Sequence, residues 1–535
     1  MSDASQHTDF DVIVVGGGVA GIYAAHILKN KLGKKVLGIE RGTGLGGTWH
    51  WNRYPGVQAD TDGIVYRYSF DQETSSEWDE QARYQKGAQI RNYLNEVAER
   101  HGVDEVYRFG QAAAEARYDD ATATWRVEIE GGEAFTARYI VSAAGVFARP
   151  VFPDIPGFDD FAGEVIHSAR WPEDAVLDDK RVGVVGTGST GGQLIVAAAK
   201  VADRLTVFQR TAQYVVPAGQ TRLGADEVRE YQENFDANWA AWRQTRLACG
   251  FDEPEAGAMD VPADEREAVF ERAWERGGGF EFMFGTFADL AFNRESNDAA
   301  AEFIKRKIRS IVKDPDIAER LIPSEPYAKR PASVDGYYET YNNDNVELVD
   351  VKANPITRIL PQGVELADGT VKELDTLVFA TGFEAIEGAY RHFEVAGRDG
   401  TRLLDQWGEA PASYLGIATP KFPNFFTLLG PQGVFSNLPP GIEAQMDFVA
   451  DLITWSGENG DAPVEVSAEA LAQWQQMCNE IANASIFAQV KSWIFGSNVH
   501  TDKPRPLFYF GGLASFREVL DGERAKEFES FRAGS

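Results

Sequence analysis

Two short apolar runs along the chain end in glycine, one at Gly16 and the other at Gly186. Each is followed by a segment whose apolar residues recur at helical spacing, residues 22–28 and residues 193–199. A short buried strand, a glycine turn and a helix, in this order, open a doubly wound nucleotide-binding fold. The pattern therefore predicts the α/β class, with two Rossmann-like dinucleotide-binding domains.

Residues 222–322 follow a different pattern. They are rich in Ala, Glu, Arg and Phe at helical spacing, so we expect a helical insertion there. Patterns typical of buried strands occur before and after it, at residues 137–145, 346–349 and 377–383. The Asp-Gly pair at 368–369 indicates a hairpin turn.

Composition and charge narrow the possible partners. The chain has 535 residues, of which 44% are apolar and 25% charged, as in a globular enzyme of several domains. Its 52 Lys and Arg against 82 Asp and Glu give a formal net charge of -30. Because such a surface repels phosphate backbones and anionic lipids, we expect neither nucleic acid nor a membrane as a partner.

Cysteine usage bears on compartment and on metal binding. Cys249 and Cys478 are far apart and form no CxxC pair, so neither a disulfide framework nor a metal site is expected. The first ten residues are polar, and the apolar run before Gly16 is too short for a signal segment or a membrane span. We expect a cytoplasmic protein.

The first glycine turn is a candidate FAD site. Gly16 permits a tight turn, Gly18 lets a pyrophosphate approach the backbone, and Gly21 lets the helix pack on the strand. The helix N-terminus then stabilises the phosphate charge. Glu40 ends the next strand, where a carboxylate can accept both ribose hydroxyls. A plain glycine-rich turn is the alternative.

Residues 46–60 favour FAD over NAD at this first site. The segment is rich in glycine and aromatic residues, as expected for the lining of an isoalloxazine ring. By analogy, enzymes with two dinucleotide folds usually bind FAD in the N-terminal one. We expect Thr48, Trp49, Asp60 and Tyr66 to line the cofactor.

The second glycine turn is a candidate NADPH site. Its residues are Gly186, Thr187, Gly188, Ser189, Thr190 and Gly191. Arg210 lies as far beyond Gly186 as Glu40 lies beyond Gly16. A guanidinium and the Thr211 hydroxyl in place of a carboxylate remove repulsion of a 2′-phosphate and donate hydrogen bonds to it, which favours NADP over NAD. A solvent-exposed arginine at a strand end is the alternative.

The chain has two such folds but no redox cysteine pair, so it cannot be a flavin disulfide reductase. The reaction that remains is hydride transfer from NADPH to FAD, after which the electrons pass to O2 or another acceptor. We expect a FAD-binding domain from residues 1–145 and 381–535, the second part also carrying the substrate pocket. The NADP-binding domain is expected to comprise residues 150–220 and 326–380, and the helical insertion residues 221–325.

Residues 161–172 fit the pattern FxGxxxHxxxWP, and residues 46–60 fit the pattern GGxWxxxxYPGxxxD. Both are signatures of the type I Baeyer–Villiger monooxygenases. Within that family the chain resembles the cyclohexanone monooxygenases along almost its whole length. Further segments that carry the resemblance are residues 206–211, 282–287, 327–331, 380–383, 437–440 and 492–496.

The resemblance implies that NADPH reduces FAD, that the reduced flavin activates O2, and that one oxygen atom enters beside a ketone carbonyl to give an ester or lactone. A cation is needed to stabilise negative charge on oxygen. The resemblance identifies Arg330 as this catalytic cation and Asp60 as the carboxylate that positions it. It places Lys329 near the NADP ribose and 2′-phosphate. On sequence alone, Lys329 and Arg330 are a basic pair of the kind usually found at surfaces.

The resemblance also implies a conformational role for His167 and Trp171, which would couple movement of the NADP domain to the flavin. An ordinary structural histidine is the alternative for His167. Trp493 is implied to lie at the nicotinamide ribose and the substrate. The residues implied to line the ketone pocket are Val146, Phe147, Phe280, Phe435, Leu438 and Phe508. Any of these apolar residues could instead belong to the core.

The chain departs from the cyclohexanone-type pattern in two places. It has Ala332 and Ser333 where the pattern reads Leu-Cys, and Gln432 and Val434 where it reads Asn and Pro. The reaction class follows from the resemblance, but the preferred ketone and the oligomeric state do not. Two rival functions stay open. One is a flavin monooxygenase acting on nitrogen or sulfur, against which Arg330 argues, and the other is a non-catalytic NADP-binding redox sensor.

Overall fold

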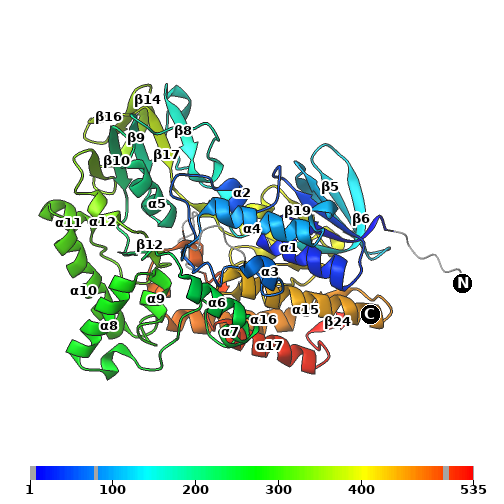
Figure 1. The fold of residues 1–535 in the computed structure, drawn as a ribbon. Coiled ribbons are helices and arrows are strands. Elements are labelled where there is room, and N and C mark those ends of the chain that lie inside the picture. The colour runs from blue at the N-terminus through cyan, green and yellow to red at the C-terminus, as the bar shows by residue number, and fades with distance from the viewer. Residues whose placement is uncertain (1–7, 77–81, 498–504, 534–535) are drawn as a thin grey trace, which may run out of the picture.

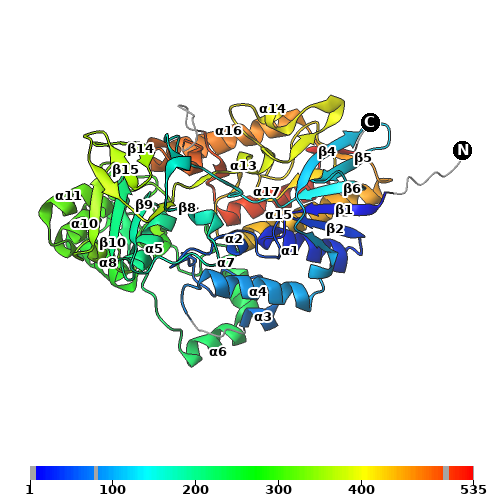
Figure 2. The same cartoon turned by 90° about the horizontal axis from the view of Figure 1, so that it is seen from above.

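The computed structural model describes residues 8–76, 82–497 and 505–533. Two lobes, each built around a sheet, lie side by side (Figures 1 and 2). One lobe contains helix α1 (Val19–His26) and the other contains helix α5 (Ser189–Ala198). Each of these helices follows one of the two glycine turns, so the α/β class and the two nucleotide-binding folds are confirmed.

The first sheet has eight strands and combines segments from distant parts of the chain. In spatial order they are β19 (Glu394–Ala396), β4 (Ala113–Asp119), β5 (Thr124–Ile129), β6 (Ala134–Ser142), β1 (Phe10–Val15), β2 (Val36–Glu40) and β3 (Tyr107–Phe109), with β20 (Phe425–Thr427) also paired to β6. Strand β1 is parallel to both neighbours, and Val12 lies opposite Val36 and Tyr139. Its apolar run is buried, as expected for a parallel strand covered on both faces.

The second sheet has five strands, all parallel. In spatial order they are β13 (Val346–Asp350), β10 (Arg204–Gln209), β9 (Arg181–Val185), β17 (Thr376–Phe379) and β8 (Glu164–His167). An antiparallel sheet of β14 (Ile356–Leu360), β15 (Gly363–Leu366) and β16 (Val371–Glu373) belongs to the same lobe (Figure 1). The Asp-Gly pair at 368–369 lies in the β15–β16 connection, as predicted.

The predicted helical insertion is helical. Its helices are α6 (Ala225–Glu233), α7 (Phe235–Trp242), α8 (Ala263–Arg276), α9 (Gly279–Phe284), α10 (Arg294–Ile311) and α11 (Pro315–Leu321). Helix α8 buries Phe270 and Trp274 on one face. Helix α10 begins after Asn293, whose side chain accepts hydrogen bonds from the N–H groups of Glu295 and Ser296.

The C-terminal part returns to the first lobe. Helix α15 (Leu438–Glu458) packs against α1, and Tyr23 donates a hydrogen bond to Asp447 across this contact at 2.8 Å. Long C-terminal helices lie beneath the first sheet in Figure 1. The remaining helices are α2 (Thr48–Trp51), α3 (Gln72–Ser76), α4 (Gly87–Arg100), α12 (Tyr337–Thr340), α13 (Glu387–Tyr390), α14 (Leu403–Trp407), α16 (Ala468–Ala484) and α17 (Leu513–Ala525).

Short strand pairs join segments that are far apart in the chain. They are β7 (Arg149–Pro150) with β18 (Phe383–Glu384), β11 (Val215–Val216) with β12 (Ala332–Ser333), β21 (Gly433–Val434) with β23 (Phe508–Tyr509), and β22 (Val464–Val466) with β24 (Phe531–Ala533). The β7–β18 pair follows β6 of the first sheet and β17 of the second. It therefore links the two lobes.

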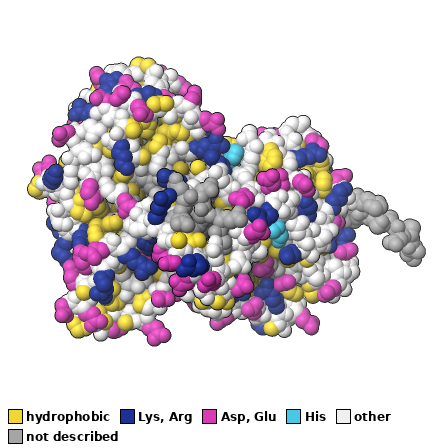
Figure 3. Space-filling view, viewed as in Figure 1, with side chains coloured by type: hydrophobic (Ala, Val, Ile, Leu, Met, Phe, Trp, Pro, Cys, Tyr) yellow, Lys and Arg dark blue, Asp and Glu magenta, His cyan; other side chains and the backbone are white. Residues whose placement is uncertain are grey.

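Acidic side chains are spread over both lobes on the face shown in Figure 3, and Lys and Arg are interspersed among them. The distribution fits the net charge of -30 without forming a large basic surface on that face. Among the described residues, no helix has the length and apolar character that spanning a bilayer demands.

Candidate functional site

The first glycine turn connects β1 to α1 at the carboxyl edge of the first sheet. Gly16 has φ +105°, which favours glycine. A Cβ on Gly21 would lie 1.9 Å from the Gly16 carbonyl oxygen, so the helix and the turn are in direct contact. A Cβ on Gly18 would meet nothing nearer than Gly47 Cα at 3.4 Å. The backbone of Gly18 thus borders space that a pyrophosphate can occupy.

Glu40 is buried at the end of β2, beside this turn. Its two carboxylate oxygens accept hydrogen bonds from the N–H of Gly17 at 2.6 Å and of Gly42 at 2.5 Å. These contacts fix the carboxylate, and each oxygen keeps a lone pair that a ribose hydroxyl can reach.

Thr48 and Trp49 follow Gly47, which lies against Gly18 of the first turn, and Tyr66 contacts Trp49. Thr48 begins α2 directly after Gly47. Trp49 Nε1 donates to the Tyr66 hydroxyl at 3.3 Å, and the two rings pack edge-to-face with centroids 5.7 Å apart. Burial raises the pKa of Tyr66 to about 12, so its hydroxyl keeps its proton at neutral pH.

The second glycine turn repeats the geometry of the first. Gly186 has φ +108°, and a Cβ on Gly191 would lie 2.2 Å from the Gly186 carbonyl oxygen. A Cβ on Gly188 would meet nothing within 4 Å, so this backbone also borders open space. Ser189 and Thr190 form the first turn of α5, where the free N–H groups of a helix N-terminus can bind an anion.

Arg210 directly follows β10, and its side chain is exposed. The neighbouring Thr211 is half-buried, and its carbonyl oxygen accepts a hydrogen bond from Thr187 Oγ1 at 3.0 Å. This contact ties the second glycine turn to the end of β10. Arg210 and the turn therefore border the same edge of the second sheet.

A direct contact between the two nucleotide-binding folds involves the segment that carries the GGxWxxxxYPGxxxD pattern. The Tyr54 hydroxyl donates to Gln193 Oε1 of α5 at 2.9 Å. Gly56 has φ +85°, and a Cβ there would lie 2.8 Å from the Gln193 carbonyl oxygen. Helix α5 thus packs against the first lobe through the Tyr-Pro-Gly part of this pattern.

Arg330 and Asp60 form a two-point ion pair. Arg330 Nη2 donates to Asp60 Oδ1 at 2.6 Å, and Nη1 donates to Oδ2. The guanidinium also lies over the Phe280 ring, 5.1 Å from its centroid. Burial disfavours the charge, but the Asp60 carboxylate outweighs burial and raises the pKa of Arg330. The result is a fixed positive charge against an aromatic ring.

The two residues of the basic pair have different partners. Lys329 pairs with Glu325 at 2.7 Å and is half-buried. Arg330 turns toward Asp60, and its Nη1 lies 3.5 Å from Ser189 Oγ of the second glycine turn. Arg330 is thus held at two points by Asp60, whereas Lys329 has a single partly exposed carboxylate partner, so its role at the NADP ribose stays a prediction.

Most of the aromatic residues implied to line the pocket contact one another. Ring centroids are 4.8 Å apart for Phe147 and Trp493, 5.7 Å for Trp493 and Phe508, and 5.9 Å for Phe508 and Phe435. The series continues through Phe487 and Phe284 to Phe280, with centroids 6.3 to 6.4 Å apart. A chain of aromatic side chains therefore runs from Phe147 to Arg330.

Val146 and Leu438 lie outside this aromatic chain. Val146 is buried, and its carbonyl oxygen accepts a hydrogen bond from the Ile386 N–H at 2.9 Å. Leu438 is the first residue of α15 and is 36% exposed. Their assignment to the pocket stays a prediction.

His167 and Trp171 are both buried, and His167 ends β8 beside the interlobe link. His167 Nδ1 accepts a hydrogen bond from the Ala169 N–H at 3.1 Å, and Nε2 is buried without a partner among the described residues. The imidazole packs edge-on against Phe152 and Phe383. Burial lowers the pKa of His167 to about 4, so the ring is neutral.

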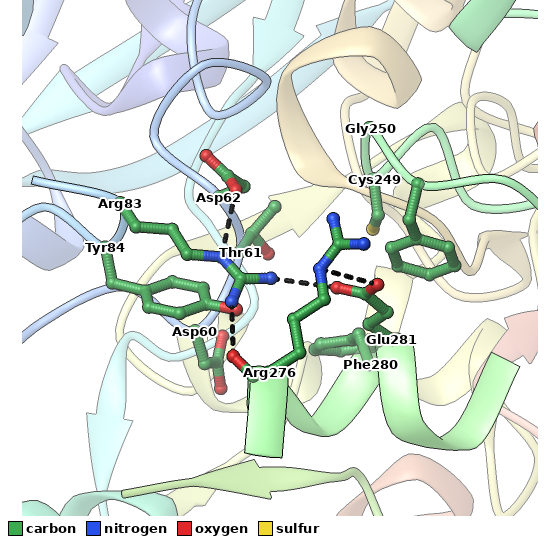
Figure 4. Close-up of a pocket in the computed structure, with 11 residues that line it drawn as sticks. Asp60, Thr61, Asp62, Arg83, Tyr84, Cys249, Gly250, Arg276, Phe280 and Glu281 are labelled. Atoms are coloured by element: carbon green, nitrogen blue, oxygen red, sulfur yellow. Dashed lines mark hydrogen bonds and ion pairs between the residues drawn. The ribbon is translucent and has the colours of Figure 1, made fainter. Parts of the chain in front are cut away.

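A cavity opens beside Asp60 (Figure 4). Its lining residues are Asp60, Thr61, Asp62, Arg83, Tyr84, Cys249, Gly250, Phe251, Arg276, Phe280 and Glu281. Sequence reasoning identified Asp60 and Phe280 but missed Arg83, Cys249 and Glu281, because their neighbours in space are distant in the chain and no local pattern marks them. Burial raises the pKa of the Cys249 thiol, which argues against a nucleophilic role.

The residues present fit FAD at the first turn and NADP at the second. Both turns leave glycine backbone open to a pyrophosphate, and a buried carboxylate beside the first contrasts with an exposed guanidinium beside the second. Among the described residues, no cluster of three or more His, Cys, Asp or Glu could hold a metal ion.

Known proteins are similar to this chain over almost its whole length. Residues 10–234 match the family model of pyridine nucleotide-disulphide oxidoreductases, a span that contains both glycine turns. A phenazine N-monooxygenase of Lysobacter antibioticus is 49% identical over 524 residues, covering 98% of this chain and 97% of that protein. A cyclohexanone 1,2-monooxygenase of Acinetobacter sp. is 45% identical over 527 residues, with coverage of 98% and 97%.

A crystal structure of cyclohexanone monooxygenase from Rhodococcus sp. Phi1 bound to NADP+ has the same fold. It matches with a TM-score of 0.96 at 44% identity, covering 98% of this chain and 99% of that one. The likeness therefore includes both sheets, the helical insertion and the C-terminal helices.

Proposed function

The chain belongs to the type I Baeyer–Villiger monooxygenases and is cyclohexanone monooxygenase-like, and from that premise we propose that it converts a cyclic ketone into an ester or lactone. It is an NADPH-dependent FAD monooxygenase. The overall change consumes ketone, O2, NADPH and one proton, and it yields ester, water and NADP+. When bound, FAD and NADPH supply the electrons and activate O2.

The observation that carries the proposal is the fixed Arg330–Asp60 pair against Phe280. Oxygen insertion places negative charge on oxygen, and a pre-positioned guanidinium stabilises this charge without reorganising. Arg330 has five N–H donors, and Asp60 accepts from two different nitrogens, so the guanidinium keeps donors for a substrate oxygen. Asp60 fixes the plane in which those donors point.

The same premise assigns the cofactor contacts. FAD is bound by Gly16, Gly18, Gly21, Glu40, Thr48, Trp49, Asp60 and Tyr66. NADPH is bound by Gly186, Thr187, Gly188, Ser189, Thr190, Gly191, Arg210, Thr211, Lys329 and Trp493. The contact between Thr187 and Thr211 supports this assignment because it unites the phosphate turn with the segment that carries Arg210.

The aromatic chain from Phe147 to Phe280 supports an apolar binding site for the ketone ring. Val146 and Leu438 are assigned to this site by the family resemblance alone. His167 packs against the link between the lobes, and the family resemblance assigns to it and Trp171 the coupling of second-lobe movement to the flavin.

The test is a panel of cyclic ketones with chromatographic identification of products, run on the wild type and Arg330→Ala. We expect the wild type to form ester or lactone in step with NADPH oxidation. Arg330→Ala should retain FAD and still oxidise NADPH. Its product per NADPH should fall roughly 100-fold, because one electrostatic donor is lost, and hydrogen peroxide should appear instead.

Lys329→Ala serves as the neighbouring control. It should raise the KM for NADPH while leaving product per NADPH near the wild-type value, because Lys329 is held by Glu325 away from Asp60. A normal ratio of ester to NADPH in Arg330→Ala would show that the catalytic assignment is wrong.

A second candidate activity is oxygenation of a ring nitrogen. The 49% identity to a phenazine N-monooxygenase favours it, since that protein matches over nearly the same length as the cyclohexanone enzyme. The product panel should therefore include an aromatic N-heterocycle. Formation of an N-oxide without ester from any ketone would replace the ketone proposal by this one.

A further inference from the structure

Helix α9 (Gly279–Phe284) carries Phe280, the ring on which the Arg330 guanidinium rests. The helix is short, and it is separated from α8 by Gly277 and Gly278, which have φ +76° and +101°. Such a junction interrupts the helical backbone, so α8 holds α9 through side chains: Arg276 Nε lies 3.1 Å from Glu281 Oε1, and Phe270 stacks on Phe282. Contacts of α9 with segments outside α8 also hold Phe280 in position.

One such contact comes from the segment that carries Asp60. Arg83 Nε lies 3.3 Å from Asp62 Oδ2, and Nη2 donates to Glu281 Oε2 at 2.8 Å. The third guanidinium nitrogen, Nη1, donates to the Arg276 carbonyl oxygen at the end of α8, also at 2.8 Å. Figure 4 shows this guanidinium between Asp62 on one side and Glu281 on the other.

The two carboxylates that Arg83 joins are next to functional positions. Asp62 is two residues from Asp60, and Glu281 follows Phe280 directly. The Arg83 side chain is only 10% exposed, so solvent screens these contacts weakly. The backbone of Arg83 is also fixed, because its N–H donates to Thr221 O at 2.9 Å and its carbonyl oxygen accepts from Gly63 N–H at 2.7 Å.

A second contact comes from the segment that carries Arg330. The Gly279 N–H, at the start of α9, donates to Ser333 Oγ at 2.6 Å. Ser333 is 2% exposed and lies in β12, three residues after Arg330. This is one of the positions where the chain departs from the cyclohexanone-type pattern, which reads Cys there, and a hydroxyl is a much better acceptor than a thiol.

We propose that Arg83 is a positioning residue for oxygenation. Together with Ser333 it holds α9 in place, so that Phe280 stays packed against the Arg330–Asp60 pair. Arg83 ties α9 to the Asp60 side of the pair, and Ser333 ties it to the Arg330 side. Arg83 touches neither substrate nor cofactor in this assignment. The inference rests on the proposed role of Arg330 in oxygenation.

The test compares Arg83→Met, Arg83→Lys and Ser333→Ala in the FAD-loaded enzyme. Arg108→Met is the matched control, since Arg108 is paired with both oxygens of Glu133 at 2.9 Å on β3, in the first sheet. Product per NADPH should fall about three- to tenfold in Arg83→Met and Ser333→Ala, because a small misplacement of a catalytic group is costly. Arg83→Lys should lie between Arg83→Met and the wild type, since Lys keeps the charge but has one nitrogen in place of the three with which Arg83 reaches its acceptors.

Two further readouts separate positioning from general damage. The rate of flavin reduction by NADPH and the FAD content should stay near the wild-type values in all variants. Amide hydrogen exchange of residues 279–284 should be faster in Arg83→Met and Ser333→Ala, and unchanged in Arg108→Met. This hydrogen exchange does not depend on the reaction. If the wild type forms no ester, the proposed function is refuted, but the exchange rates still test whether Arg83 and Ser333 hold α9 in place.

The inference is overturned if Arg83→Met keeps both the wild-type product ratio and the wild-type exchange of α9. It is also overturned if product ratio, FAD content and melting temperature all fall together in Arg83→Met and Arg83→Lys, since that pattern marks a residue needed only for folding.

Discussion

Individual charges in this protein are held by specific partners. Asp60 orients Arg330, Glu325 holds Lys329, and backbone N–H groups fix Glu40. Arg210 differs because its side chain is exposed at the end of β10. An exposed guanidinium beside a phosphate-binding turn is available to an incoming 2′-phosphate.

Arg210→Ala should weaken NADPH selectively. A charge-assisted contact at a partly exposed site is worth about 1.5–3 kcal/mol, so the KM for NADPH should rise about tenfold or more. The KM for NADH should hardly change, because NADH lacks the 2′-phosphate. Steady-state kinetics with both coenzymes measure this difference. An equal loss for both would show that Arg210 supports the fold only.

Two buried histidines predict an acid-sensitive fold. Burial lowers the pKa of both His26 and His167 to about 4, against about 6.5 in an unfolded chain. The native rings are neutral, so protonation favours the unfolded state, and stability is lost as pH falls from 6.5 toward 4. Each ring contributes a loss of roughly 2–3 kcal/mol at the acid end.

Urea unfolding of the wild type and His26→Gln between pH 7.5 and pH 4.5 measures this loss. The variant should show a shallower fall in unfolding free energy below pH 6.5, because it has one fewer ring to protonate. Parallel curves for the two proteins would contradict the assignment to His26.

Site residues differ in how far the sequence could predict them. Glu40 and Arg210 follow from their distance to a glycine turn, which is a local rule of the fold. Arg330 follows only from the family resemblance, since a basic pair before proline has no chemical signature of its own. Arg83 has no sequence signal, because Asp62 and Glu281 are brought to it by tertiary structure.

The helices, strands and turns that the sequence predicted are those determined by neighbouring residues in the chain. The strands before Gly16 and Gly186, the helices after them and the Asp-Gly hairpin all arise from short-range pattern. The π-helical turn at Ile27–Lys31 and the short pairs such as β7–β18 and β21–β23 were not predicted. Each short pair joins segments far apart in the chain, so no window of sequence contains both strands.

The first glycine turn gives a prediction for FAD binding. Gly18→Val should abolish FAD retention, because a Cβ there already lies 3.4 Å from Gly47 Cα and the two added methyl groups would fill the space left for the pyrophosphate. Absorbance of purified protein at flavin wavelengths measures occupancy. We predict that FAD is bound without a covalent link, so acid precipitation of the wild type should release all flavin.

Gly522→Val provides the control for this substitution. Gly522 lies in α17, and a Cβ there would meet nothing within 4 Å. This variant should keep full FAD occupancy without a loss of stability, because Val is a better helix former than Gly. Full occupancy in Gly18→Val as well would show that the first turn does not bind the pyrophosphate.

The molecule as a whole follows the predicted architecture. Family, α/β class, two nucleotide-binding folds, helical insertion and cofactors are confirmed, while the domain boundaries and residue roles stay predictions. Arrangement of the lobes could not be predicted, because it depends on contacts such as Tyr54 with Gln193 that join two separately recognisable folds.

Tyr54→Phe tests this interlobe contact. Loss of this neutral buried hydrogen bond should cost about 1 kcal/mol. Because hydride transfer requires the two lobes to be correctly placed, its rate should fall about fivefold. Stopped-flow reduction of the flavin by NADPH measures this rate. FAD content should not change, and an unaltered reduction rate would show that Gly56 and the surrounding packing suffice to seat α5.

The first sheet includes β19 and β20, which follow the second lobe in the chain, and this has a consequence for biosynthesis. While the ribosome is still making the second lobe and the helical insertion, β4 has no β19 and β6 has no β20 to pair with. Unpaired strand edges in a nascent chain invite aggregation. The yield of folded protein should therefore depend on translation speed, growth temperature and chaperone capacity more than on the stability of the finished enzyme.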